Sequence, residues 1–296
     1  MKRLLPLTVA ACMLLFASCS SNNSSSTTTD STATTDTSAV APGSTDGFKL
    51  GVQMWTFKEF TFTQALDKVD SAGIKNIEAF WGQKLGGDMT GNFGIDMNAA
   101  TKDKLKKLLQ GKGIQIVAMG VIVPKNRAEW IKAFDLAKEF GLSYITCEPI
   151  KTHWDMIDSL AGVNGIKIAI HDHPKPNAYW SPDSVLAAVQ NHTNIGSCAD
   201  IGHWARNGLD PVECLKKLDG HVFGVHLKDI VKFDDTQAAD TVVSKGVIDF
   251  PAVFAELKRQ NFNGMLSIEH ESNWLHSLPD VVVTKKYFDE QIAKLK

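Results

Sequence analysis

Four polar side chains in the second half of the chain each stand at the end of a short apolar run. Three of them are carboxylates and one is an imidazole, so together they would form a mixed oxygen and nitrogen ligand set. Such a set suits a divalent ion that does not require sulfur ligands, namely Mn2+, Mg2+, Co2+ or Zn2+. We therefore expect one divalent metal ion as a cofactor. The four candidate ligands are Glu148, Asp200, His226 and Glu269.

The apolar runs that precede these residues belong to a pattern that extends from residue 48 to residue 296. Eight short runs alternate with segments of helical periodicity, and about 250 residues is the usual size of a (β/α)8 barrel. An open doubly wound sheet would show a glycine-rich phosphate-binding turn after an early strand, and the sequence has none. We predict an α/β fold, a single (β/α)8 TIM barrel. The predicted strands are 50–55, 74–80, 114–122, 142–147, 166–170, 195–199, 222–225 and 265–268.

The barrel prediction brings the candidate ligands together. In a (β/α)8 barrel the carboxyl ends of all strands meet at one mouth, where the active site lies. A lone carboxylate at a strand end is more often a helix cap or an ion-pair partner, but four such residues on four strands favour a shared site. The polar segment 233–245 is predicted to be a loop over this mouth. The predicted helices are 63–72, 98–110, 126–140, 154–160, 181–189, 211–218, 250–259 and 278–293.

Several short motifs resemble the xylose isomerase-like superfamily of sugar isomerases and epimerases. They are the glutamate after the fourth strand, D-x-x-H at 200–203, H-L-K-D at 226–229 and the glutamate after the eighth strand. The resemblance covers most of the predicted barrel and implies that the four candidate ligands hold one divalent ion. It also implies that His203 hydrogen-bonds a substrate oxygen, and that Glu148 and Glu269 act as catalytic acid and base groups.

Metal-assisted proton abstraction is the chemistry that this resemblance implies. A metal bound to a sugar carbonyl oxygen and the neighbouring hydroxyl stabilises an enediolate while a carboxylate removes the α-proton, which leads to isomerisation or epimerisation. The same abstraction can drive β-elimination, so a lyase or hydratase that acts on 3-keto-glycosides or their enone products is an alternative. A non-catalytic carbohydrate-binding lipoprotein is another. The formal net charge of −2 offers no basic groove for nucleic acid and disfavours a phosphodiesterase.

Further side chains near the predicted strand ends are candidates for substrate binding. In His171-Asp172-His173, where many relatives carry E-N-H, we expect only one histidine to face the pocket and favour His173. Lys228 is a candidate for binding a substrate oxygen, with an ion pair as the alternative. Glu78 either hydrogen-bonds substrate or orients a ligand, and Trp81 either stacks on a sugar ring or packs in the core.

The N-terminal region predicts export. A basic start, an apolar run at 4–16 and the tripeptide A-S-C indicate a lipoprotein signal peptide at 1–19, with Cys19 as the lipidated residue. The run is shorter than the roughly 20 residues that span a membrane, and the Ser- and Thr-rich segment 20–47 is typical of a disordered tether. We expect a protein that is lipid-anchored at a bacterial membrane, faces the periplasm and acts on an unphosphorylated sugar or keto-sugar. The sequence leaves the oligomeric state open.

Overall fold

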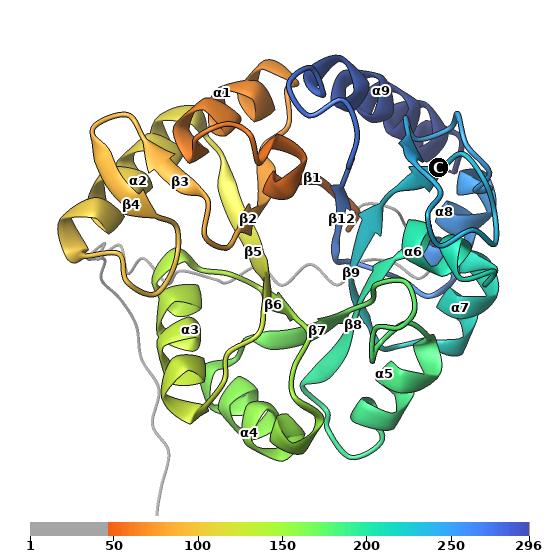
Figure 1. Ribbon diagram of the computed structural model, residues 1–296, viewed down its shortest axis with the longest axis horizontal. Coiled ribbons are helices and arrows are strands. Elements are labelled where there is room, and N and C mark those ends of the chain that lie inside the picture. The colour runs from red at the N-terminus through yellow and green to blue at the C-terminus, as the bar shows by residue number, and fades with distance from the viewer. Residues whose placement is uncertain (1–46, 296) are drawn as a thin grey trace, which may run out of the picture. The chain divides into compact units, whose positions relative to one another are not determined.

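Eight parallel strands close into a barrel with helices between them (Figure 1). The computed structural model describes residues 47–295, and the predicted signal peptide, Cys19 and nearly all of the predicted tether lie outside this range. The prediction of a single (β/α)8 TIM barrel is confirmed. Within residues 47–295, no helix combines the length and the hydropathy that crossing a membrane requires.

The eight barrel strands coincide with the eight predicted apolar runs. Around the barrel their order is β1, β12, β9, β8, β7, β6, β5 and β2, so β7, β8, β9 and β12 are consecutive neighbours. The strands are β1 (Lys49–Gln53), β2 (Asn76–Phe80), β5 (Gln115–Ile122), β6 (Tyr144–Cys147), β7 (Lys167–His171), β8 (Ile195–Asp200), β9 (Val222–Leu227) and β12 (Met265–Ile268).

The helices lie around the outside of the barrel (Figure 1). Many begin at a side-chain cap: Thr61 forms a capping box with Gln64, and Asn126 accepts a hydrogen bond from the Glu129 backbone N–H. Gly141 ends one helix in the left-handed conformation that favours glycine. The helices are α1 (Phe62–Ser71), α2 (Ala99–Lys112), α3 (Arg127–Phe140), α4 (Trp154–Asn164), α5 (Pro182–Val189), α6 (Ile201–Arg206), α7 (Pro211–Lys217), α8 (Phe250–Arg259) and α9 (Leu278–Leu295).

Two small antiparallel sheets were not predicted. The strands β3 (Lys84–Gly86) and β4 (Met89–Asn92) form a hairpin after β2. The second sheet pairs β10 (Asp229–Ile230) with β11 (Asp240–Thr241), so the segment 233–245 is not entirely loop. Strands of two to four residues are too short to show the alternation of polar and apolar residues from which strands are predicted.

The first predicted strand is shorter than expected. It ends at Gln53, and the 3-10 helix η1 (Met54–Phe57) follows, because the Gln53 side chain accepts a hydrogen bond from the Trp55 backbone N–H. A second 3-10 helix, η2 (Lys151–His153), precedes α4. The helix η1 follows β1 directly, whereas residues 148–150 separate η2 from β6.

Candidate metal centre

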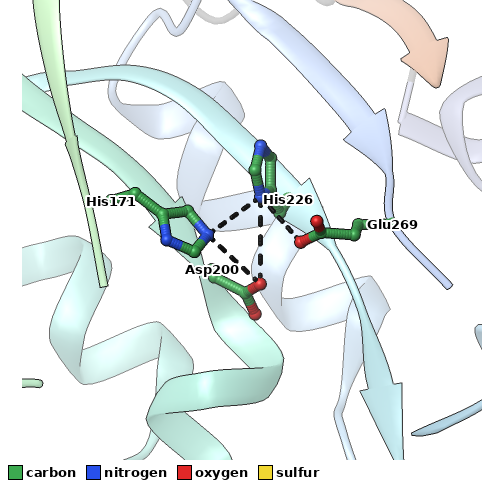
Figure 2. Close-up of side chains that lie close together, drawn as sticks. All are labelled: His171, Asp200, His226 and Glu269. Carbon is green, nitrogen blue, oxygen red and sulfur yellow. Dashed lines mark hydrogen bonds and ion pairs between the residues drawn. The ribbon is translucent and has the colours of Figure 1, made fainter. Parts of the chain in front are cut away.

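Four side chains from four consecutive barrel strands converge at the mouth (Figure 2). Each stands at or near the carboxyl end of its strand: two end β7 and β8, one is the penultimate residue of β9, and one follows β12 directly. All four are buried, and their ligand atoms lie within 4.8 Å of one another. These residues are His171, Asp200, His226 and Glu269.

The distances in this cluster suit a bound cation. His226 Nδ1 lies 2.9 Å from Glu269 Oε2 and 3.1 Å from His171 Nε2. Asp200 Oδ2 lies 3.6 Å from His171 Nε2 and 3.8 Å from His226 Nδ1. An ion with bonds of about 2.1 Å separates neighbouring ligand atoms by roughly 3.0 to 3.4 Å. Asp200 Oδ2 and Glu269 Oε2 are buried and accept no hydrogen bond, so both have lone pairs free for a metal. Two imidazoles and two carboxylates fit Zn2+, Mn2+ or Co2+.

The D-x-x-H motif explains how Asp200 is held. Its Oδ1 caps helix α6 by accepting a 2.9 Å hydrogen bond from the His203 backbone N–H, which leaves Oδ2 directed at the cluster. The Asp200 backbone N–H in turn donates to Asp172 Oδ1 at 2.9 Å. Burial and the nearby Asp200 charge raise the pKa of Asp172 well above its usual value. The spacing of the motif is therefore that of a helix cap which also presents one carboxylate oxygen to a metal.

Glu78 orients His226 from inside the barrel. The His226 Nε2–H donates to Glu78 Oε2 at 2.9 Å, and the Ser267 hydroxyl donates to the same oxygen at 3.3 Å. Burial alone would raise the pKa of Glu78, but the charge and hydrogen bond of His226 outweigh burial and lower it. A carboxylate behind a ligating histidine fixes its tautomer and leaves the other nitrogen for the metal. Of the two roles considered for Glu78, the structure favours orientation of a ligand over contact with substrate.

Glu148 stands at the end of the fourth barrel strand, as predicted, but its carboxylate is not part of the cluster of four. It follows β6, on the far side of His171 from the cluster, with its Oε1 3.7 Å from His171 Nδ1 and in contact with His173 Nδ1. The Asn177 amide donates to its Oε2 at 2.8 Å. Burial would raise the pKa of Glu148, but the nearby His171 imidazole and the hydrogen bond from His173 hold it well below its usual range. The cluster of four therefore contains His171 in addition to three of the predicted ligands, and Glu148 groups instead with His171 and His173.

The expectation that only one histidine of His171-Asp172-His173 faces the pocket was wrong. Residues two apart on a strand share a face, and the two imidazole rings lie 4.6 Å apart. Together with Glu148 they form a second group of side chains with metal-ligating atoms. Burial would lower the pKa of His171, but the Asp200 and Glu148 carboxylates, 3.6 and 3.7 Å from its ring nitrogens, raise it to about 9.

Lys228 and His203 are buried beside the cluster. The Lys228 ammonium lies 2.9 Å from Asp200 Oδ2, 3.1 Å from Glu269 Oε2, 3.1 Å from Glu271 Oε2 and 3.2 Å from His203 Nε2. Burial would lower the pKa of Lys228, but these carboxylates raise it well above its usual value. Burial, together with the charge of Lys228, holds the pKa of His203 well below its usual value, although Asp200 acts in the opposite direction. Lys228 is thus a cation and His203 a neutral imidazole.

A cavity of about 220 Å³ opens on the cluster. It is smaller than the roughly 300–1,000 Å³ of sites for drug-sized ligands, and it suits a single sugar-sized ring. Trp81 lies outside it and lines a separate cavity of about 420 Å³ that contains none of the clustered ligands. The smaller cavity is lined by Gln53, Trp55, Phe80, Gly120, Val121, His171, His173, Glu269 and Glu271.

Two residues of the site were not identified from the sequence. Glu271 lies two residues after Glu269, and its carboxylate accepts a 2.8 Å hydrogen bond from Trp55 Nε1. Arg206 lies one helical turn after His203, and its Nη1 is 2.9 Å from His203 Nδ1. The spacings i+2 on a strand end and i+3 on a helix place each of them beside a candidate site residue.

Known proteins resemble this chain over most of its length. It is 28% identical to an inosose dehydratase of Clostridium botulinum (strain Alaska E43 / Type E3) over 265 residues, which cover 73% of this chain and 84% of the relative. A crystal structure of an uncharacterized protein from Parabacteroides distasonis ATCC 8503 is 32% identical, has a TM-score of 0.67 and covers 82% of this chain and 99% of that chain. The IOLI protein, solved with a zinc atom bound, shares the fold with a TM-score of 0.67 at 19% identity, over 84% of this chain and 99% of its own. The model of the xylose isomerase-like TIM barrel family matches residues 66–293, which confirms the resemblance found in the sequence: the chain belongs to this family.

Proposed function

We propose that this protein is a metal-dependent lyase that removes water from a keto-sugar or keto-cyclitol. The observation that carries the proposal is the buried cluster of two imidazoles and two carboxylates at the barrel mouth. The relative named inosose dehydratase supports elimination over isomerisation. An isomerase or epimerase, which the sequence motifs favoured, would share the first chemical step, the removal of a proton, and differ in the second.

A divalent ion held by His171, Asp200, His226 and Glu269 would act as a Lewis acid on a substrate oxygen and make the proton on the adjacent carbon more acidic. The base that removes this proton must reach the cavity. His173 lines the cavity and its side chain is 42% exposed, whereas Glu148 contacts its Nδ1 from behind. Because a carboxylate accepts the Nδ1–H, the Nε2 lone pair of His173 is free to take a proton.

The leaving hydroxyl requires a proton from a second group beside the cluster. Elimination moves the electrons of the broken C–H bond into a new carbon–carbon double bond, and the C–O bond breaks as its oxygen is protonated to water. Lys228 and His203 are the nitrogen donors beside Asp200. Glu148 then acts as a positioning residue for His173, and Glu269 as a ligand, in place of the acid and base roles that the sequence resemblance implied.

The substrate class is inferred from the cavity and from the expected location of the protein. A cavity of about 220 Å³ accepts one ring. We further propose that the chain is exported and anchored through Cys19, as its N-terminal sequence predicts. Sugar phosphates are largely cytoplasmic, so an anchored enzyme would meet unphosphorylated substrates.

The test is metal-dependent elimination in heavy water. The purified chain, loaded with Mn2+, Co2+ or Zn2+, is incubated with an inosose and with a 3-keto-glucoside, and products are followed by proton NMR and by enone absorbance. We expect loss of water that stops on chelation and in Asp200→Asn, but continues in Asp289→Asn, which removes an exposed carboxylate paired with Lys285. Deuterium uptake next to the carbonyl without loss of oxygen would indicate an isomerase or epimerase instead. Sugar affinity that survives chelation, with neither reaction, would indicate a binding protein.

A further inference from the structure

A second cavity lies beside the one that opens on the metal-ligand cluster. Its volume is about 420 Å³, against about 220 Å³ for the cavity at the cluster. Both cavities border the ends of the neighbouring strands β2 and β5. Phe80 lines the cluster cavity and the next residue, Trp81, lines the second one; Val121 and Ile122 divide in the same way. The second cavity is therefore a neighbour of the candidate active site at the barrel mouth.

Two connections at the carboxyl ends of these strands wall the second cavity. One is the β2–α2 connection, which contains the hairpin β3–β4, and the other is the β5–α3 connection. The Trp81 backbone N–H donates to the Gly120 carbonyl at 3.3 Å, which ties the first connection to β5. The lining residues are 81–82, 90–98 and 122–124, with Thr101 of α2 and Glu129 of α3.

An indole face is available in this cavity. The Trp81 side chain is half-buried. A Cβ at Gly94 would lie 3.7 Å from Cε2 and Cζ2 of the indole and 3.9 Å from Cδ2, which places it over the ring face at ordinary contact distance. Because Gly94 has no side chain, this space over the ring stays open to the cavity. A flat apolar surface, such as the C–H face of a sugar ring, can stack there.

The polar lining residues suit an uncharged ring with hydroxyl groups. Thr90, Asn92 and Asp96 are exposed, and within residues 47–295 their side chains have no hydrogen-bond or ion-pair partner. The lining includes two carboxylates, Asp96 and Glu129, but no lysine, arginine or histidine. A phosphate or another anionic group would be repelled by these carboxylates. The cavity therefore favours a neutral sugar.

We propose that the second cavity binds a second sugar ring, so that the substrate is a keto-glycoside. Its keto ring lies at the metal-ligand cluster and its attached ring stacks on Trp81. The position of the keto ring rests on the proposed function, whereas the site for the attached ring rests on the lining of the second cavity. A keto-cyclitol without an attached ring would leave this cavity unused. Trp81 is then a specificity-determining residue, in the stacking role considered from the sequence.

The affinities for one-ring and two-ring ligands test this site. The Zn2+-loaded chain is titrated by calorimetry with 3-keto-glucose, and with maltose and cellobiose oxidised at carbon 3 of the non-reducing ring; a sugar that is converted is compared by its KM. We expect at least one of the two disaccharides to bind about tenfold more tightly than 3-keto-glucose, the effect of one aromatic contact. No advantage of either disaccharide in the wild type would overturn the proposal, even if variants of Trp81 do not fold.

A pair of tryptophan variants locates the second ring. In Trp81→Leu the affinity for the disaccharide should fall to that for 3-keto-glucose. Trp274→Leu is the matched control, because Trp274 is also half-buried but lines neither cavity, and it should keep the advantage. An equal loss for one-ring and two-ring ligands in Trp81→Leu would show a merely structural role, and loss of the advantage in Trp274→Leu alone would place the ring elsewhere; either result would overturn the proposal.

The same titration separates this inference from the proposed function, because calorimetry needs no turnover. An advantage of the disaccharide without elimination would remove the proposed function and keep the second sugar site. Elimination with equal affinities for one-ring and two-ring ligands would keep the proposed function and remove the site.

Discussion

Replacing Glu78 with glutamine probes how the barrel interior tunes the metal centre. Glu78 is fully buried and accepts hydrogen bonds from His226 Nε2 at 2.9 Å and from the Ser267 hydroxyl at 3.3 Å. Glutamine has nearly the same shape and keeps an acceptor oxygen, but it removes the negative charge. The His226 imidazole then becomes a poorer electron donor at Nδ1, the nitrogen that faces the cluster.

The expected loss is about tenfold in metal affinity. A hydrogen bond to a charged group contributes about 1.5–3 kcal/mol and a neutral one about 0.5–1.5 kcal/mol, so the exchange costs about 1–1.5 kcal/mol. About 1.4 kcal/mol corresponds to a factor of ten in affinity. The expected loss therefore agrees with the lower end of the 10- to 100-fold losses in metal affinity that follow when the hydrogen-bond partner of a ligating histidine is removed. Competition between the metal-free protein and a chelating dye measures this affinity for Zn2+ and Mn2+.

Glu256→Gln is the matched control, because Glu256 is also a buried carboxylate but pairs with Arg259 on α8 and lies outside the cluster. Its metal affinity should equal that of the wild type. Affinity in Glu78→Gln within twofold of the wild type, in a folded protein, would refute the assignment of Glu78 as the residue that orients His226.

Three further perturbations test separate parts of the structure. Gly202→Ala should destabilise the fold by about 1–3 kcal/mol, because the alanine Cβ would lie 2.6 Å from the Lys228 Cγ. Thermal unfolding measures this loss, and an unchanged Tm would contradict the close packing of Gly202 against Lys228. Metal must displace a proton from His171, whose pKa is raised to about 9, and one from His226, whose pKa is raised well above its usual value, so affinity should rise with pH by up to about a hundredfold per unit below pH 9. A flat profile would be inconsistent with protonated ligands. Asp229→Asn weakens the hydrogen bonds that the Asp229 carboxylate accepts from four backbone N–H groups in 244–248. We therefore expect faster amide hydrogen exchange in this segment. Exchange at the wild-type rate would show that Asp229 does not hold the segment in place.

The sequence predicted the barrel and three of the four clustered side chains because both depend on local patterns. Each barrel strand is a buried apolar run, and Asp200, His226 and Glu269 stand at or near the end of such a run. Which side chain completes the cluster depends on the order of the strands around the barrel and on how far each strand extends towards the mouth. Glu148 also follows a strand, but β7 lies between β6 and β8, so the last residue of β7 is the one that reaches Asp200. Residues two apart on a strand share a face. The prediction that His173 faces the pocket therefore also implied His171.

The partners that orient the site were harder to predict because they are distant in the chain. Glu78 and His226 are 148 residues apart, and nothing in the run 74–80 marks Glu78 as a partner of a particular histidine. The contact of Arg206 with Asp240 depends on the short strands β10 and β11, whose two-residue lengths carry no periodic signal. Local patterns thus located the mouth, and the pairing across the barrel decided the role of each side chain.

The location of the metal tests the central claim most directly. Crystals of the purified chain loaded with Zn2+ or Mn2+ give an anomalous difference map at the absorption edge of the metal. We predict one dominant peak bonded to His171 Nε2, Asp200 Oδ2, His226 Nδ1 and Glu269 Oε2, with Glu148 turned towards His173. A peak bonded to Glu148 in place of His171, or no peak at the barrel mouth in metal-loaded protein, would contradict it.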